Sequence, residues 1–331
     1  MFTGRMRYVD AVQSVKKISK IGLGTWQFGS REWGYGSSYA EAGAAEIVTR
    51  ALELGVTLFD TAEIYGFGRS ERILGRALGS QATDAFIATK IFPVLPTAPM
   101  VEQRAVASAN RLGVQRLDLY QVHQPNPVVT DGTTMRGMAV LQQVGLVDQV
   151  GVSNYSLERW QAAEAALGSP VLTNQVRYSL VDRRPERDLV GWAEQQGRLI
   201  IAYSPLAQGV LSGRYDRDHQ PGNGVRRLNP MFLPENLDRA GGLIQVLREV
   251  AATHDATPSQ IALGWLLHRP HVVAIPGASS VEQLERNVAA AEIDLADDEY
   301  AALTQASDRL ELLTGAAVLR PLLRKLTARR T

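Results

Sequence analysis

Four residues of this 331-residue chain have side chains that could form one proton-donating site. Asp60 and Tyr65 follow the short apolar run 57–59, Lys90 follows the run 85–89, and His123 follows the run 117–122. A phenol donates a proton poorly at neutral pH, because its unperturbed pKa is about 10. A neighbouring ammonium lowers that pKa, and a carboxylate can hold the ammonium in place. The sequence supplies all three groups, together with an imidazole that could orient a carbonyl.

Each of these residues also has an ordinary alternative explanation. Asp60 is typical of a turn or helix cap, Lys90 of a solvated strand end, and His123 of a loop before Pro125. Their shared position after three successive strand-like runs favours a joint role, since unrelated structural roles would not place them together.

The elements that must position these residues alternate along the chain. Apolar runs typical of strands lie at 21–26, 57–59, 85–89, 117–122, 150–152, 172–176, 199–203 and 272–275. Helical patterns lie at 42–54, 70–78, 101–112, 134–144, 157–167, 186–196, 237–254 and 281–291, with Ser70 as a predicted N-cap. Another helix is predicted after Thr257, which opens a capping box. This alternation predicts a parallel α/β fold but is typical of both barrels and doubly wound sheets.

Polar residues at the carboxyl ends of the other strands favour the barrel. Ser153 and Asn154 end the fifth run, Gln175 the sixth, Tyr203 the seventh and Gly277 the eighth. In a (β/α)8 barrel these ends converge on one face, where active sites lie. We therefore predict a single-domain α/β (β/α)8 TIM barrel over residues 1–310.

Two extensions flank the predicted barrel. Residues before Ile18 are expected to form an N-terminal β-hairpin that covers the barrel floor. Residues 311–331 form a basic C-terminal tail with a helical pattern. A basic amphipathic tail could bind a membrane surface or a partner, or it could pack on the barrel or fray.

Composition excludes several classes of function. Net charge is only +1, which gives no electrostatic reason to expect nucleic acid as a partner. The absence of cysteine excludes disulfides, thiol catalysis and thiolate metal sites, and it fits a cytoplasmic protein. We find no signal peptide, integral membrane segment, P-loop or metal-ligand pattern. A Rossmann fingerprint is also absent, because Gly22-x-Gly24 lacks its third glycine. Oligomeric state stays open.

A set of motifs in order resembles the aldo-keto reductases, in particular their bacterial and potassium-channel β-subunit-like branches. The motifs are 22-GLGTW-26, 60-DTAEIYG-66, Lys90, His123, 151-GVSN-154, 174-NQ-175, 203-YSPL-206 and 275-IPGAS-279. The resemblance covers residues 18–290. It implies that Tyr65 is the general acid, that Lys90 lowers the pKa of Tyr65, that Asp60 forms an ion pair with Lys90, and that His123 orients the carbonyl.

The same resemblance implies that NADP(H) binds without a Rossmann fold. Ser153, Asn154 and Gln175 would hold the carboxamide, Tyr203 would stack on the nicotinamide, and the loop after it would line the pyrophosphate. The implied cofactor-binding residues are Thr25, Trp26, Asp60, Ser153, Asn154, Gln175, Tyr203, Ser204, Pro205, Leu206, Gln208, Gly277, Ser279, Gln283 and Asn287. Further candidates are Arg226 or Arg227 on a lid over 215–234, Arg286 as a 2′-phosphate cation, and the pocket aromatics Trp26, Trp33 and Tyr35.

Three functions are compatible with these residues. The first is NADPH-dependent reduction of a small aldehyde or ketone to an alcohol, with Tyr65 as the acid. The second is an NADP-binding, redox-sensing regulatory subunit with slow turnover. The third is a hydrolase that uses Asp60 and Glu63 as paired acids.

Overall fold

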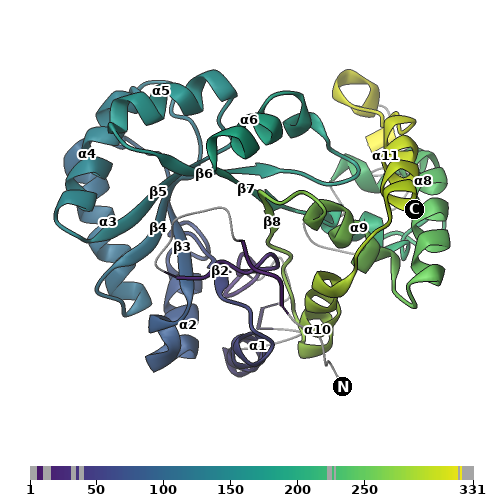
Figure 1. Cartoon of the computed structure of the whole chain (residues 1–331), viewed down its shortest axis with the longest axis horizontal. Helices are drawn as coiled ribbons and strands as arrows, with labels where there is room; N and C mark the ends of the chain where they lie inside the picture. The colour runs from purple at the N-terminus through teal and green to yellow at the C-terminus, as the bar shows by residue number, and fades with distance from the viewer. Residues whose placement is uncertain are drawn as a thin grey trace, which may run out of the picture.

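Strands and helices alternate through the whole computed structural model, which describes residues 6–9, 16–30, 35–36, 41–221, 226, 229–319 and 321–322 (Figure 1). The strands are β1 (Leu23–Gly24), β2 (Leu58–Asp60), β3 (Phe86–Ile91), β4 (Leu117–Val122), β5 (Val147–Ser153), β6 (Val171–Arg177), β7 (Leu199–Tyr203) and β8 (Val272–Ala274). The α-helices are α1 (Glu41–Glu53), α2 (Arg69–Leu78), α3 (Ala98–Leu112), α4 (Asp131–Gln143), α5 (Leu157–Leu167), α6 (Leu189–Gln196), α8 (Pro234–Thr253), α9 (Pro258–Leu267), α10 (Val281–Ala289) and α11 (Asp297–Asp308).

The strands form one closed parallel sheet. The strands are arranged in the order in which they occur in the sequence, β1 to β8, and each pairs in parallel with the next. Parallel bridges Ile21–Ala274 and Gly24–Gly277 join the first strand to the last. This closure confirms the predicted (β/α)8 barrel and excludes the doubly wound sheet, whose edge strands stay unpaired.

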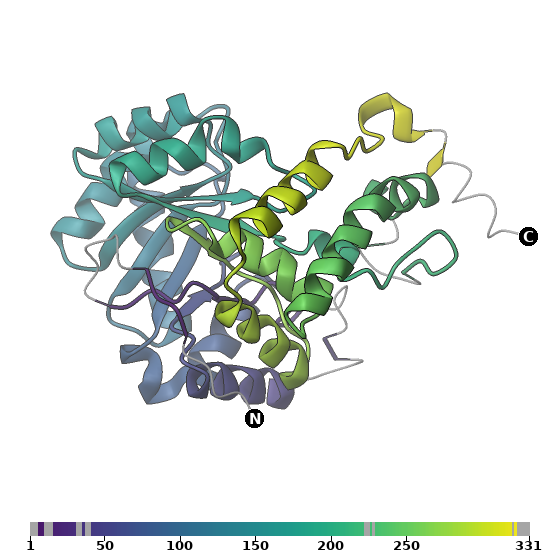
Figure 2. The ribbon, with the colours of Figure 1, turned by 45° about the vertical axis from the view of Figure 1, so that its right-hand side comes forward.

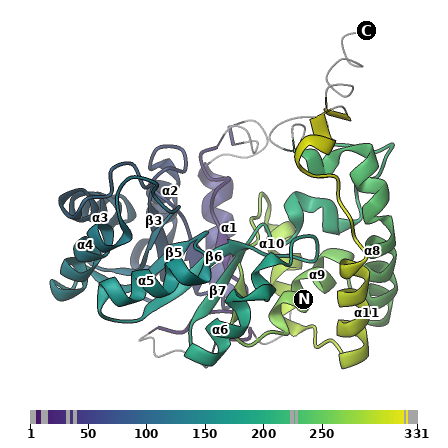
Figure 3. The ribbon, with the colours of Figure 1, turned by 90° about the horizontal axis from the view of Figure 1, so that it is seen from above.

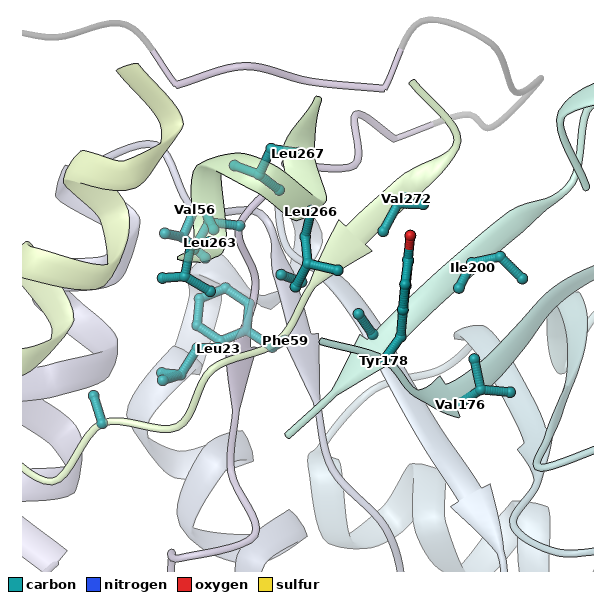
Figure 4. Packing of buried hydrophobic residues seen from close by; sticks show 14 of the residues in the cluster. Leu23, Val56, Phe59, Val176, Tyr178, Ile200, Leu263, Leu266, Leu267 and Val272 are labelled. Atoms are coloured by element: carbon teal, nitrogen blue, oxygen red, sulfur yellow. The ribbon is translucent and has the colours of Figure 1, made fainter. Parts of the chain in front are cut away.

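Side chains of each strand alternate between the barrel interior and the surrounding helices, as the pleat requires. Leu58, Phe86 and Leu119 belong to the interior cluster. Phe59, one residue after Leu58, belongs instead to the larger core beneath the helices. Figure 4 shows Phe59 beside Leu23 of β1 and facing α9. Asp60 and Lys90 therefore share the inner side with Leu58 and Phe86.

An N-terminal antiparallel pair closes the floor of the barrel, as predicted. Tyr8 pairs with Ser19, and the main-chain N–H of Val9 donates to Ile18 O over 2.8 Å. Ile18 and Val9 pack against the interior cluster, which includes residues at the amino ends of β2, β3 and β7. The turn of the expected hairpin, 10–15, lies outside the described residues.

The helix α11 was not predicted. It lies beside α8 at one edge of the barrel (Figures 1 and 3). The segment after it continues near α8 (Figure 2), where Asn236 Oδ1 accepts from the main-chain N–H of Leu313 over 2.7 Å. This part of the tail therefore packs on the barrel, whereas Arg320, Arg324, Lys325, Arg329 and Arg330 lie outside the described residues.

Two helix starts test the predicted caps. Thr257 forms the expected capping box with Gln260 at the start of α9. Ser70 is not an N-cap, because α2 begins one residue earlier and Gly68 takes that position. The buried Ser70 hydroxyl instead donates to Thr25 O over 2.9 Å, so it joins the loop after β1 to α2.

Candidate active site

A buried ion pair lies at the carboxyl ends of β2 and β3. Lys90 Nζ donates to Asp60 Oδ1 over 2.7 Å and to the main-chain oxygen of Thr61 over 2.8 Å. The Lys90 side chain is fully buried and that of Asp60 is 3% exposed. Burial lowers the pKa of Lys90, and the charge of Asp60 opposes that change. The pairing predicted from sequence is therefore present.

Tyr65 and His123 lie next to this pair. Tyr65 is in the turn after β2, and Lys90 Nζ is 5.1 Å from its ring centroid. The rings of Tyr65 and His123 are 5.7 Å apart and nearly perpendicular, and the Trp26 ring lies 6.3 Å from Tyr65. Residues from the ends of β2, β3 and β4 thus meet in one place, as the barrel hypothesis required.

The predicted lowering of the Tyr65 pKa by Lys90 stays a prediction, because burial dominates the net shift. The pKa of Tyr65 is raised well above its ordinary value, first by burial and then by the charges of Asp60 and Tyr203. The net shift is upward although the Lys90 ammonium lies 5.1 Å from the ring centroid. Tyr65 is consequently a neutral phenol at physiological pH, and donation of its proton requires groups that stabilise the phenolate.

His123 is held as a neutral imidazole. Burial and the positive charge of Lys90 lower its pKa to about 3. Its ring packs edge-on against Phe92, at 6.0 Å between centroids, and Nδ1 is buried without a hydrogen-bond partner among the described residues. The sequence reasoning missed Phe92, which ordinary apolar patterning does not distinguish from a core residue.

Glu63 forms a separate ion pair and does not act with Asp60. Its carboxylate accepts from the Arg104 guanidinium and from the main-chain N–H of Phe92. Asp60 is bound to Lys90 and to Gln175. Each acid therefore has its own cation, and the geometry gives no shared pair for acid–base hydrolysis.

Hydrogen bonds connect the predicted nicotinamide-binding residues at the ends of β5, β6 and β7. Tyr203 donates its hydroxyl to Asn154 Oδ1 over 3.0 Å, and Asn154 Nδ2 donates to Ser153 Oγ over 3.0 Å. Ser153 Oγ donates to the main-chain oxygen of Gln175 over 2.8 Å. Gln175 Nε2 donates to Asp60 Oδ2 over 2.7 Å. The amide and hydroxyl groups from three strands thus form one network beside the ion pair.

The loop after β7 has an unusual backbone. Ser204, Ala207 and Gln208 have φ values of 49°, 50° and 56°, in the left-handed region that L-residues rarely adopt. Pro205 and Leu206 lie between them. Gln208 is fixed further by Arg226 Nε, which donates to its main-chain oxygen over 2.9 Å, and by Asn229 Nδ2, which donates to Oε1 over 2.9 Å. Arg226 of the predicted lid therefore lies at this loop, and Arg227 lies outside the described residues.

Residues after β8 lie at the start of α10. Ser279 donates to Gln283 Oε1 from both its main-chain nitrogen and its hydroxyl, over 3.0 and 3.1 Å. Asn287 Nδ2 donates to Gly277 O over 3.2 Å. Gln27, which the sequence reasoning missed, packs on Gly277, where a Cβ would meet its Oε1 at 2.6 Å. No motif in the sequence marks Gln27 as part of this site.

Of the predicted site residues after β1, some are buried in the fold and one, Trp26, is exposed. Thr25 is buried and donates its hydroxyl to the main-chain oxygen of Asp60 over 2.9 Å. Trp26 is 40% exposed beside Tyr65, which suits the predicted substrate side. Tyr35 packs against the main core, and Trp33 lies outside the described residues.

Backbone strain concentrates on this face of the barrel. Among the described residues with positive φ that are not glycine, all but Asp255 lie on loops at the carboxyl ends of strands. Such conformations persist only where the surrounding structure holds them, and they gather at ligand-binding sites. Within the described ranges, no group of three His, Asp or Glu side chains is arranged to hold a metal, and every helix is too short or too polar to cross a bilayer.

Comparisons with known proteins agree with this geometry. Residues 20–308 match the model of the aldo/keto reductase family. An uncharacterised oxidoreductase of Mycobacterium tuberculosis is 54% identical over 325 residues, which span 98% of this chain and 100% of that protein. The structure of a glycerol dehydrogenase from Gluconobacter oxydans superposes with a TM-score of 0.83 at 27% identity, covering 95% of this chain and 98% of that one.

A second solved structure comes from Klebsiella pneumoniae. This aldo/keto reductase, in complex with NADP and acetate, has a TM-score of 0.69 and 27% identity, covering 90% of this chain and 96% of that one. The family match spans the whole barrel, including both strands that carry the Asp60–Lys90 pair. The chain therefore belongs to the aldo/keto reductase family and is an oxidoreductase.

Proposed function

We propose that this chain reduces an aldehyde or ketone to an alcohol with NADP(H), using Tyr65 as the general acid. The observation that carries the proposal is the buried Asp60–Lys90 pair in contact with the Tyr65 ring and next to a neutral His123. The choice of cofactor draws on the Klebsiella pneumoniae relative, whose structure contains NADP. When bound, NADPH supplies the hydride for the reduction.

Tyr65 would give its hydroxyl proton to the carbonyl oxygen of the substrate. Burial raises the pKa of Tyr65, so the phenol carries its proton at neutral pH but needs a stabilised phenolate in order to transfer it. The fixed ammonium of Lys90, 5.1 Å from the ring centroid, would stabilise the phenolate as it forms. Asp60 keeps that ammonium in place over 2.7 Å. Lys90 would thus offset part of the penalty that burial imposes on the phenolate.

His123 would orient the carbonyl. Its pKa of about 3 keeps the imidazole neutral, so one ring nitrogen carries a proton that it can donate. Perpendicular contacts with the rings of Tyr65 and Phe92 restrict the orientation of the His123 ring. Trp26, whose ring lies 6.3 Å from that of Tyr65, would border the substrate.

The remaining groups would hold the cofactor. Amides at the ends of β5 and β6, from Asn154 and Gln175 with the hydroxyl of Ser153, suit a carboxamide, and Tyr203 lies beside them. The strained loop after β7 and the start of α10 suit phosphates, because loops after strands 7 and 8 commonly form phosphate sites in TIM barrels. The predicted members there are Ser204, Pro205, Leu206, Gln208, Gly277, Ser279, Gln283 and Asn287, with Arg226 and Arg286 as candidate cations.

A fluorescence titration with NADPH and NADH tests the proposal, with wild type beside Tyr65→Phe. We expect tighter binding of NADPH than NADH by both proteins, and loss of carbonyl reduction in Tyr65→Phe alone. Binding without turnover of any reactive aldehyde by wild type would instead support the redox-sensing subunit. Absence of binding would reject both functions.

We also propose a cytoplasmic location, because a chain without cysteine fits a reducing compartment, where disulfides are rare. Cell fractionation followed by immunoblotting would test it, and recovery in the secreted fraction would contradict it.

A further inference from the structure

The carboxamide of Gln175 crosses the interior of the barrel. Gln175 is on β6 and Asp60 is on β2, which is four strands away in either direction around the closed sheet. Nevertheless Gln175 Nε2 donates to Asp60 Oδ2 over 2.7 Å, and both residues are buried. The two strands lie on opposite walls, so this hydrogen bond spans the barrel.

The bond from Gln175 completes the fixation of the Asp60 carboxylate. Lys90 occupies Oδ1 from β3, and Gln175 occupies Oδ2 from β6, each over 2.7 Å. A carboxylate held at both oxygens from different directions cannot rotate without losing one charge-assisted hydrogen bond. The position of the Lys90 ammonium beside Tyr65 therefore depends on the opposite wall of the barrel.

The main chain of Gln175 is fixed equally well. Its carbonyl oxygen accepts from Ser153 Oγ over 2.8 Å and from the main-chain N–H of Asn154 over 2.9 Å. The same residues form the network that ends on Tyr203. Gln175 is thus the point at which the proposed cofactor-binding network meets the ion pair.

We propose that Gln175 is a positioning residue for proton transfer, acting through Asp60 and Lys90 on Tyr65. This role goes beyond holding the cofactor, and it rests on the proposed function because it concerns the proton that Tyr65 donates. Small misplacements of reacting groups cost up to about a hundredfold in rate. Loss of the Gln175–Asp60 bond is therefore expected to slow the chemical step even when cofactor is saturating.

Gln175→Asn is the most direct test, because it keeps a carboxamide but shortens the side chain by one methylene. The control is Thr173→Val on the same strand, which removes the hydrogen bond from Thr173 Oγ1 to Gln121 Oε1 and leaves Asp60 untouched. The dissociation constant for NADPH is measured by fluorescence. The single-turnover rate of NADPH oxidation with a reactive aldehyde is measured at saturating NADPH.

We expect the single-turnover rate of Gln175→Asn to fall by about tenfold to a hundredfold, whatever its dissociation constant, and that of Thr173→Val to stay within about twofold. We expect no further loss when Gln175→Asn is added to Asp60→Asn, because Asp60→Asn already removes the carboxylate through which Gln175 would act. If Gln175→Asn does not fold, Gln175→Met, which keeps the length but has no donor, gives the same comparison.

A change in the dissociation constant alone, with the single-turnover rate unchanged, would overturn the positioning role and leave Gln175 as a cofactor ligand. Additive losses in the double variant would also overturn it. Failure of the proposed function is distinct, because wild type itself would then show no turnover, and the inference would fall with it.

Discussion

Replacing Lys90 by methionine tests how much the fold depends on pairing the buried Asp60 carboxylate with a cation. Methionine keeps most of the side-chain volume but removes the ammonium, which donates to Asp60 and to the Thr61 carbonyl. Asp60 would then be a carboxylate with 3% exposure and, among the described residues, only the Gln175 amide as a partner. An uncompensated buried charge is the expected result.

The magnitude follows from that burial. Removing one partner of a buried ion pair costs about 3–5 kcal/mol. A chain of 331 residues has an unfolding entropy near Tm of about 0.7 kcal/mol/K. Lys90→Met should therefore lower Tm by about 4–7 °C. Adding Asp60→Asn removes the buried charge and leaves a neutral unpaired carbonyl at Thr61, which costs about 1–3 kcal/mol.

Urea denaturation of wild type, Lys90→Met and the double variant, all without cofactor, measures the effect. The double variant should be more stable than Lys90→Met by about 2 kcal/mol, with equal dependence on urea concentration. A loss below about 1 kcal/mol in Lys90→Met would refute the reasoning. A double variant that is less stable than Lys90→Met would also refute the reasoning, because the unpaired Asp60 charge would then not be the cause of the lost stability.

Three further predictions concern Lys20, Gly151 and His123. Lys20 donates to the carbonyls of Arg269 and Pro270. Burial, and then the charge of Arg7, lowers the pKa of Lys20 to about 7, and the charge of Glu194 opposes that change. The unfolded chain binds more protons above pH 7, so stability should rise by on the order of 2 kcal/mol between pH 7 and 9 in urea denaturation, and Lys20→Met should lose that rise. Gly151→Ala should cost about 1–3 kcal/mol in the same assay, because its Cβ would lie 2.2 Å from Thr173 Oγ1. The control Gly191→Ala, with open space around its Cβ inside α6, should be neutral or stabilising; equal losses would contradict the packing argument. His123→Gln should lower the rate of carbonyl reduction without moving its pH profile between pH 5 and 8, because the wild-type imidazole titrates near pH 3; a shifted profile would show that His123 ionises in that range.

Local sequence was sufficient for much of the site. Asp60 and Lys90 directly follow apolar runs, so local patterning alone placed them at strand ends. The barrel rule then predicted that residues from the ends of β2, β3 and β4 would meet. The meeting of Tyr65, Lys90 and His123 confirms that expectation. Ser70 was misassigned because a hydroxyl before a helical pattern resembles a cap, and only the packed loop after β1 reveals its other partner.

The sequence by itself determined the alternation of strands and helices and the identity of the chemical groups, because both depend on neighbours within a few residues. The tertiary structure alone decided the charge state of those groups, because burial and charges from distant strands set the pKa of Tyr65 and of His123. It also decided which partner each acid has, Lys90 for Asp60 and Arg104 for Glu63. The bond from Gln175 to Asp60 joins residues 115 positions apart, a proximity that only closure of the barrel produces.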